Sequence, residues 1–506
     1  MIKHWQTNQE YHCFLANAKT TFDSSERVRL QSELASTREK LRLLDTDAAM
    51  RFLDPFYSNT GRPALNQPQI LRSFILFSLL VSTDLTSPSL TSWVKRLKSD
   101  RVLASLIGCP LNSLPPLGSY YDFMDRLWTD PNHSLYKRNK LLSPGWNRKK
   151  PNKPKGKHQK ASETHPSITD SLVSRILDGK DIPFNFEARL QKLFFVVAVL
   201  PSLKCGLIPE DLLTVSGDGT AVHTHSNPNG HCLPHPDQTI SPQEYASLPR
   251  HYSDPDASWG WDSDLDSFCF GYTLFQLSCH NPVLHTDIPL LLRFTSAKRH
   301  DSVSFLVAFH ELEKHMPGLP IKNICLDSAM DNLPTYRLLK DRKISALIDL
   351  NSKSGHPKTI HDNIRINKNG TPVCAAGLPM LPNGNDYSSK GHIGCQMWRC
   401  PYGKDHKTKC KCSCTSSKYG RVIKTRPEWD IRLYTDIPRG TEAYKKIYKQ
   451  RTATERINNR ILNDYGLHRL MIHRREHYSF MTTMIGICLH LDGRYKQKAK
   501  ASLSEI

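Results

Sequence analysis

The sequence lacks any apolar run long enough to cross a membrane. A bilayer-spanning helix needs about 20 predominantly apolar residues, but the apolar stretch at residues 193–200 is stopped by Pro201, and the stretch at residues 70–81 contains Arg72. The amino-terminal residues also lack the uninterrupted apolar segment of a secretory signal peptide. We therefore expect a protein that neither spans a membrane nor is secreted.

Acidic residues are scarce relative to basic ones. The chain has 69 Lys and Arg against 48 Asp and Glu, which gives a formal net charge of +21. An excess of this size favours a polyanionic partner. Nucleic acid is a better candidate for this partner than a membrane surface. The composition therefore predicts a protein that binds nucleic acid.

The sequence gives no support for a disulfide framework or for a single core. Its 14 Cys are expected to be thiols or metal ligands, because a chain without a secretory segment folds in a reducing compartment. A length of 506 residues is too great for one compact core, so two or three domains are expected. With 38% hydrophobic and 23% charged residues, the chain has enough apolar side chain to fold.

The chain divides into regions of different composition. Residues 1–135 are expected to be helical, with candidate helices at 21–44, 70–81 and 89–106. Residues 136–166 are predicted to be a basic flexible linker, because residues 136–160 hold ten Lys or Arg and no acidic residue. Such a linker could replace counterions on a phosphate backbone.

Residues 167–506 are predicted to form an α/β domain with a mixed sheet. Short apolar runs alternate with helical stretches there, as expected of strands and helices packed in layers. The strand candidates are residues 212–216, 268–277, 290–294, 321–326 and 344–348, and the helix candidates are 302–315, 333–341, 440–462 and 478–491. Residues 351–430, rich in Gly, Pro, Lys and Cys, are predicted to be an inserted subdomain.

Two aspartates follow apolar strand candidates. Asp218 follows residues 212–216 and lies between two glycines, and Asp327 follows residues 321–326. Either residue alone is most simply a turn residue. If the two strands are neighbours, however, the carboxylates converge, and such a pair of like charges is costly unless a divalent cation lies between them.

A third acidic residue lies on a late helix. Tyr448, Arg451 and Glu455 are spaced at i, i+3 and i+7, which places them on one stripe of a helix. The simplest interpretation is an exposed helix face with an Arg–Glu pair. The functional interpretation requires this stripe to dock against the two aspartates, where Glu455 would complete an oxygen site for Mg²⁺ or Mn²⁺ and Arg451, supported by Tyr448, would hold a phosphate.

The order of these five residues resembles that of the DDE transposases of bacterial insertion sequences, which have a ribonuclease-H-like core. The resemblance covers about residues 60–490. The stretch GRPALNQPQILRSFILFSLL resembles the helical amino-terminal region of those proteins, and AKRHDSVSF, with His300 and Asp301, resembles their segment between the third strand and the first helix of the core. One departure is Leu462, since a large group of these transposases has a basic residue seven positions after the Glu.

The resemblance implies an enzyme of DNA transposition. Such an enzyme cuts double-stranded DNA at the terminal inverted repeats of an insertion sequence and joins the ends to target DNA by two-metal phosphoryl transfer. It implies Asp218, Asp327 and Glu455 as the catalytic ligands of two Mg²⁺ or Mn²⁺ ions, with Arg451 and Tyr448 binding the phosphate. It further implies a homodimer in the DNA complex, and a place of action in the bacterial cytoplasm, at the nucleoid.

Five cysteines lie close together within the predicted insertion. They are Cys395, Cys400, Cys410, Cys412 and Cys414. Thiols at this density predict a structural Zn²⁺, which would give a loop-rich segment a folded state. The spacing is not a standard paired CxxC pattern, so reduced thiols without metal are the alternative. Trp398 is expected to be a buried side chain of this subdomain, although it could instead stack on an unpaired base.

Two further functions compete with a DNA transposase. The first is a non-catalytic DNA-binding protein, in which the basic linker and the Cys-rich insertion bind DNA and the three acidic residues are structural. The second is a zinc-dependent hydrolase centred on His223 and His225. We prefer an exposed loop for this histidine segment, because no suitably spaced carboxylate accompanies it.

Overall fold

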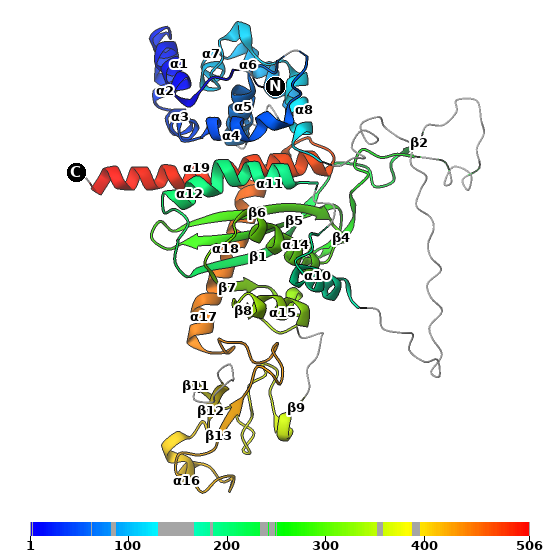
Figure 1. Cartoon of the computed structure of the whole chain (residues 1–506), viewed down its shortest axis with the longest axis vertical. Coiled ribbons are helices and arrows are strands. Elements are labelled where there is room, and N and C mark those ends of the chain that lie inside the picture. Colours follow the sequence, from blue (N-terminus) through cyan, green and yellow to red (C-terminus); the bar gives the residue numbers. More distant parts are fainter. Residues whose placement is uncertain are drawn as a thin grey trace.

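The structure is a computed structural model in which an all-helical amino-terminal region lies above a central mixed sheet (Figure 1). It describes residues 4–61, 63–81, 88–129, 166–182, 186–232, 250–351, 358–386 and 395–504, with the single residues 2, 241 and 248. The predicted basic linker at residues 136–166 falls outside these ranges except for its last residue.

The amino-terminal region consists of short helices, as the sequence predicts. They are α1 (Asn8–Thr20), α2 (Ser24–Gln31), α3 (Ala35–Arg42), α4 (Thr46–Leu53), α5 (Gln67–Leu80), α6 (Leu90–Ser99), α7 (Arg101–Leu106) and α8 (Leu117–Arg126), with short 3₁₀ turns η1 (Asp54–Phe56) and η2 (Leu111–Ser113). Helix α5 is buried along most of its length, as its apolar sequence indicates. Its Arg72 is also buried, because Nη1 donates to Gln6 Oε1 (2.7 Å) and Nη2 to Thr46 Oγ1 (2.9 Å).

Two of the predicted helices are each divided into two. Residues 21–44 form α2 and α3, and residues 89–106 form α6 and α7. The second break lies at Asp100, whose backbone is extended and whose carboxylate accepts the amide of Leu103. A short polar side chain that caps a new helix competes with continuation of the preceding one. The apolar periodicity predicts helix on both sides of Asp100 but not this cap.

The central sheet has six strands and is mixed. Its strands are β1 (Leu213–His223), β4 (Ser258–Asp262), β5 (Ser267–Asn281), β6 (Thr286–Ser296), β7 (Ile321–Leu326) and β8 (Ser345–Ile348). The order is β4-β5-β1-β7-β8, and β6 pairs with β5. Strands β4, β5, β6 and β1 pair antiparallel, whereas β1, β7 and β8 pair parallel. The five predicted strands are therefore confirmed, and β4 is an additional one.

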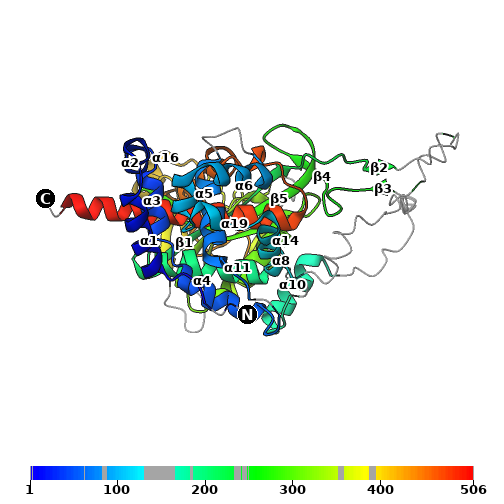
Figure 2. The ribbon, with the colours of Figure 1, turned by 90° about the horizontal axis from the view of Figure 1, so that it is seen from above.

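Helices cover the sheet and connect it to the amino-terminal region. They include α10 (Ile168–Leu177), α11 (Ala188–Phe194), the π-helical η3 (Phe195–Val199), α12 (Leu200–Lys204), α14 (Asp301–His315), η4 (Ser328–Met330) and α15 (Leu333–Asp341). The carboxyl-terminal elements are α17 (Glu442–Tyr448), η7 (Lys449–Arg451), α18 (Thr452–Asn459), the π-helical η8 (Arg460–Asp464), η9 (Leu467–Arg469) and α19 (Arg475–Ser504). Seen from above, the amino-terminal helices overlie α19 and α11 (Figure 2).

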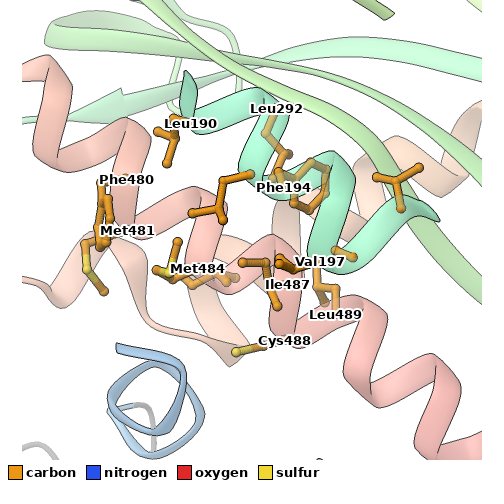
Figure 3. Packing of buried hydrophobic residues seen from close by; sticks show 14 of the residues in the cluster. Leu190, Phe194, Val197, Leu292, Phe480, Met481, Met484, Ile487, Cys488 and Leu489 are labelled. Atoms are coloured by element: carbon orange, nitrogen blue, oxygen red, sulfur yellow. The ribbon is translucent and has the colours of Figure 1, made fainter. Parts of the chain in front are cut away.

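Helix α19 lies between the amino-terminal region and the sheet. Its apolar side chains pack against α11 on one side and face α5 on the other (Figure 3). Gly486 permits this close packing, because a Cβ there would lie 2.5 Å from Leu292 Cδ1 and 3.0 Å from Phe194 Cε2. One continuous hydrophobic core therefore extends from the amino-terminal helices into the sheet.

Residues between β8 and α17 form small separate sheets. Strands β9 (Thr359–Ile360) and β10 (Ile364–Arg365) make one, and β11 (Leu381–Asp386), β12 (Cys395–Arg399) and β13 (Val422–Thr425) make another, with the short α16 (His406–Lys409) and the turns η5 (His361–Asn363) and η6 (Gly403–Asp405) nearby. A further pair, β2 (His231–Cys232) and β3 (Arg250–His251), lies beyond β1. Across the parts of the chain that the structure describes, no helix has the length and apolarity needed to span a membrane.

Candidate active site

Asp218 lies inside a strand, not at its end as the sequence predicts. Strand β1 continues through both flanking glycines to His223, because β5 pairs with it along this whole length, Asp218 opposite Gln276. Gly217 fits there between Leu326 and Leu277, at 2.8 and 3.0 Å from where its Cβ would be. The two glycines therefore serve close packing in a continuous strand, and the expected turn is wrong.

Asp327 follows its strand as predicted and is adjacent to Asp218. Strand β7 ends at Leu326, and the parallel pairing of β1 with β7 places Leu326 opposite Gly217. The residues that follow these two partners are Asp327 and Asp218. The condition set by the sequence, that the two strands be neighbours, is therefore met.

The segment that carries Glu455 docks on these same strands. Ser216 Oγ of β1 donates to Gln450 O (2.9 Å), Tyr448 Oη donates to Leu326 O (3.2 Å), and the buried Gln276 Nε2 of β5 donates to Thr454 O (2.8 Å). The segment is not the single regular helix expected, because the 3₁₀ turn η7 separates α17 from α18. The predicted docking nevertheless occurs.

Arg451 lies between two of the acidic residues. Its Nη1 is 3.5 Å from Asp218 Oδ2, and its Nη2 is 2.6 Å from Glu455 Oε1. The side chains of Arg451 and Asp218 are 22% and 20% exposed, whereas Glu455 is 49% exposed. The guanidinium of Arg451 therefore supplies positive charge between Asp218 and Glu455.

A fourth carboxylate, Asp301, lies in the same place. It is in the first turn of α14, and its Oδ1 would be 2.7 Å from a Cβ built on Gly219. It raises the pKa of Asp218, and its own pKa is raised by burial and by Asp327. The resemblance noted in the sequence places Asp301 in a family segment but gives it no role. The sequence signal that could have identified Asp301 as a site residue is its position at the start of a predicted helix that follows a predicted strand.

The four carboxylates line one open hollow of about 870 Å³. Arg451, Lys298 and Arg299 line it as well, so the hollow carries both signs of charge. The pKa of Asp218 is raised from 3.8 to about 7, mainly by burial and to a lesser extent by Asp301 and Asp327, against the opposing effects of Arg451 and the amide of Gly219. Buried carboxyl groups that repel one another are common at sites that bind a cation or perform catalysis.

The donor set at this hollow suits a hard divalent cation, which prefers carboxylate oxygens. Among the described residues, however, no group of three or more His, Cys, Asp or Glu side chains is close enough together to hold a metal ion. The carboxylates that could supply ligands are those of Asp218, Asp327 and Glu455, with Asp301 beside them. Arg451 would have to leave Asp218 before an ion could bind between the carboxylates.

The helical segment after Glu455 does not supply a basic residue at position 462, where the resemblance in the sequence suggested one. Leu462 lines the hollow with Asn458, Asn459 and Asn463. The π-helical segment η8 begins at Arg460, whose Nη2 pairs with Asp492 Oδ2 of α19 (2.5 Å). Arg460 is therefore engaged by α19, and amide side chains occupy the corresponding surface.

The five predicted zinc cysteines are only partly brought together. Cys400 Sγ is 3.2 Å from His406 Nδ1, and Cys414 Sγ is 3.9 Å from His406 Nε2. Cys412 interacts electrostatically with Cys410, Cys414 and Cys374. Cys395 is buried in β12. Trp398 is also buried, as expected, and its Nε1 donates to Thr425 Oγ1 (2.8 Å).

The described part of the histidine segment, which starts at the last residue of β1, does not form a second site. His223, at the end of β1, pairs with Asp262 (Nε2 to Oδ2, 2.7 Å), and His225 is exposed. The described residues there, which include His231, hold no third metal ligand. Asp254, which lies near this segment, is buried and accepts hydrogen bonds from Thr224, Ser226 and Tyr272. The zinc hydrolase hypothesis therefore has no support in the described residues.

The sequence was also compared with protein families and curated proteins. A family described as "Transposase DDE domain" matches residues 213–491, from the first residue of β1 into α19. The matched range includes Asp218, Asp327 and Glu455. No curated protein matches the chain.

Proposed function

The chain belongs to the transposase DDE domain family, and on this premise we propose that it cuts the ends of an insertion sequence and joins them to target DNA. The family suggests an enzyme that cleaves and transfers DNA strands with divalent metal ions. In this proposal, Asp218, Asp327 and Glu455 hold two Mg²⁺ or Mn²⁺ ions, and Arg451 and Tyr448 bind the reacting phosphate.

One observation carries this proposal: three acidic residues far apart in the sequence line a single hollow. The segment with Glu455 is attached to β1, β5 and β7 by separate hydrogen bonds. If these acidic residues were only structural, one ion pair with a basic residue would be enough for each of them. Instead, besides burial, repulsion by Asp301 and Asp327 raises the pKa of Asp218, and repulsion by Asp327 raises the pKa of Asp301. Arg451 offsets part of this repulsion, and a bound cation would relieve the rest.

The side chains of the hollow suit phosphoryl transfer. When bound, two divalent cations would activate the attacking oxygen and stabilise the leaving oxygen. Arg451 exchanges its carboxylate partners for a phosphate group, and its guanidinium donates to two of the phosphate oxygens bidentately. Tyr448 holds the segment in place through its hydrogen bond to Leu326 O. Lys298 and Arg299, which are exposed at the rim, attract the DNA backbone.

The proposal also covers the domains of the chain, its partners and its place of action. The mixed sheet would be a ribonuclease-H-like core within residues 167–506, interrupted by a Cys-rich insertion at residues 351–430. Residues 1–135 would bind DNA ends or assemble the complex, and residues 136–166 would be a basic linker. The partners would be double-stranded DNA and a second copy of the chain, and the place of action would be the bacterial cytoplasm, at the nucleoid.

We include a structural Zn²⁺ in the insertion as part of the proposal. The ligands would come from Cys395, Cys400, Cys410, Cys412 and Cys414, and the contact of His406 with Cys400 adds an imidazole to the candidates. Metal analysis of the purified chain should find about one zinc per chain, and the Cys400→Ser variant should lose it. Absence of zinc from the wild-type protein purified without chelator would reject this part.

The decisive experiment replaces the acid that sits at the strand end. The Asp327→Ala protein should not cleave duplex DNA from the ends of the element in Mg²⁺, while its affinity for that DNA stays within about threefold of the wild type. Asp341→Ala, at the exposed end of α15, is the matched control and should cleave normally. Cleavage by Asp327→Ala would reject the assignment, and absence of cleavage by the wild type would favour a non-catalytic DNA-binding protein.

A further inference from the structure

An exposed apolar surface adjoins the hollow and has no partner in the proposed mechanism. It lies on the hairpin of β4 and the start of β5, at the edge of the sheet (Figure 1). Trp259, Trp261, Leu265 and Phe268 are 55%, 53%, 65% and 71% exposed. We call residues 258–270 the aromatic hairpin. Contiguous exposed apolar surfaces of this kind mark interaction sites more often than accidents of folding.

The aromatic side chains form two cross-strand pairs on one face. Trp259 is paired with Phe270 and Trp261 with Phe268, with ring centroids 5.6 and 5.1 Å apart. The alternating residues Gly260 and Asp262 face the protein, because a Cβ on Gly260 would lie 2.6 Å from Ala297 O and Asp262 is buried. The pleat of the strand therefore presents its aromatic residues to solvent.

The hairpin is held in a fixed shape. Asp262 Oδ1 accepts the amides of Asp264 and Leu265 in the turn (3.0 and 3.3 Å), and its Oδ2 lies 2.7 Å from His223 Nε2. Ser258 Oγ accepts the amide of Lys298 at the end of β6 (2.9 Å). The exposed rings therefore stand on a preorganised support, which lowers the entropy cost of binding.

The hairpin and the carboxylates share one surface. Trp261 and Phe268 line the same hollow as Asp218, Asp327 and Glu455. The exposed Lys298 and Arg299 line this hollow as well. Phe268 lies eight residues along β5 from Gln276, the partner of Asp218. At about 3.3 Å per residue this is roughly 26 Å, or about seven to eight base pairs of DNA at 3.4 Å each.

From this placement we propose that the aromatic hairpin inserts apolar side chains into the base stack of bound duplex DNA, up to seven or eight base pairs from the cleaved phosphodiester. This inference rests on the proposed function, which places DNA in the hollow. Apolar wedges of Phe and Leu side chains partly unstack base steps and bend the duplex, which brings more protein surface into contact with it. Lys298 and Arg299, which line the same hollow, bind phosphates of this duplex, because their positive charge is complementary to the DNA backbone.

The test measures distortion and affinity without cleavage, on the full chain in EDTA. The probe is a duplex of about 40 base pairs from the end of the element that carries the coding sequence, with a fluorescent adenine analogue placed at successive positions. The wild type should raise the fluorescence at a position within about eight base pairs of the cleavage site. The Trp261→Ala/Phe268→Ala protein should lose this signal and bind the duplex about tenfold or more weakly.

Two controls keep the result interpretable. Val283→Ala removes an apolar side chain of equal exposure (69%) outside the hollow and should change neither readout. Trp261→Phe keeps an aromatic ring and should keep most of the signal. Thermal unfolding of the double variant should remain cooperative and close to that of the wild type, because the ring pair that it removes lies mostly at the surface and outside the core.

The possible results separate this inference from the proposed function. A double variant that distorts and binds the duplex like the wild type overturns the inference, even if the wild type cleaves in Mg²⁺. Loss of self-association without loss of DNA distortion also overturns it and assigns the surface to a second copy of the chain. A protein that distorts DNA through the hairpin but never cuts it overturns the proposed function and leaves this inference standing.

Discussion

Replacement of Asp218 by Asn should stabilise the metal-free protein at high pH. The pKa of this carboxyl is raised from 3.8 to about 7, first by burial and further by Asp301 and Asp327, against the opposing effect of Arg451. Below pH 3.8 the group is protonated in both the folded and the unfolded chain. Between pH 3.8 and 7 the folded chain binds more protons, so its free energy of unfolding falls as the pH rises.

The size of this effect follows from the two pKa values. At 1.36 kcal/mol for each pH unit, the rise from 3.8 to about 7 corresponds to a ceiling of about 4 kcal/mol above pH 7. The side chain is 20% exposed, so solvent moderates but does not remove the penalty. Asn has nearly the shape of a protonated Asp and carries no charge. We therefore expect Asp218→Asn to gain about 2 to 4 kcal/mol at pH 8 and nothing at pH 3.5.

The assay is urea unfolding of the two full chains in EDTA at several pH values from 3.5 to 8. The difference between variant and wild type is the informative quantity, since other groups titrate in the same range and cancel. Glu455→Gln is the control, because its carboxylate is half exposed and paired with Arg451, and it should show no comparable gain at pH 8. An Asp218→Asn protein that is equally or less stable than the wild type at pH 8 would refute the reasoning.

Three further substitutions, one of them with a matched control, test other parts of the structure. Asp301→Asn removes a buried carboxylate whose own pKa is raised and which also raises the pKa of Asp218. Urea unfolding in EDTA should therefore show a gain in stability at pH 8 that is smaller than that of Asp218→Asn, and an unchanged stability would contradict the placement of Asp301. Gly486→Val should lower the free energy of unfolding by about 1 to 3 kcal/mol, because its side chain would meet Leu292 and Phe194, whereas Gly118→Ala, with open space around it, should be close to neutral. Burial lowers the pKa of His490 to about 3, so this residue contributes stability above pH 6.5 that is lost as the pH falls toward 3; His490→Gln should show a smaller loss of stability than the wild type between pH 6.5 and 4.

The sequence predicted the elements of the fold better than their continuity. Residues 321–326 and 333–341 are a strand and a helix with the predicted bounds, because an apolar run and a polar boundary are local signals. The breaks at Asp100 and at η7 were not predicted. The break at Asp100 arises from a local cap, which the apolar periodicity on both sides of it concealed. The break at η7 lies where the chain contacts β1, a contact that the local sequence does not show.

The candidate site shows the same division. The order and spacing of Asp218, Asp327 and Glu455 are enough to indicate the family, and the family match includes all three. Their nearness depends on β1 and β7 being parallel neighbours and on Gln276 and Ser216 holding the late helical segment. The position of Asp218 within the strand was mispredicted because flanking glycines indicate a turn unless a partner strand packs against them.

The sequence by itself determined the excess of basic charge, the alternation of apolar runs that builds the sheet, and the three acidic residues that lie within the range of the family match. Only the tertiary structure decided that Arg451 lies between two of these acids, that Asp301 joins them, and that the aromatic hairpin borders the same hollow. The physical reason is that composition and periodicity act through neighbours in the chain. Electrostatic coupling between carboxylates and the exposure of an aromatic ring depend instead on distances between residues that the chain order leaves open.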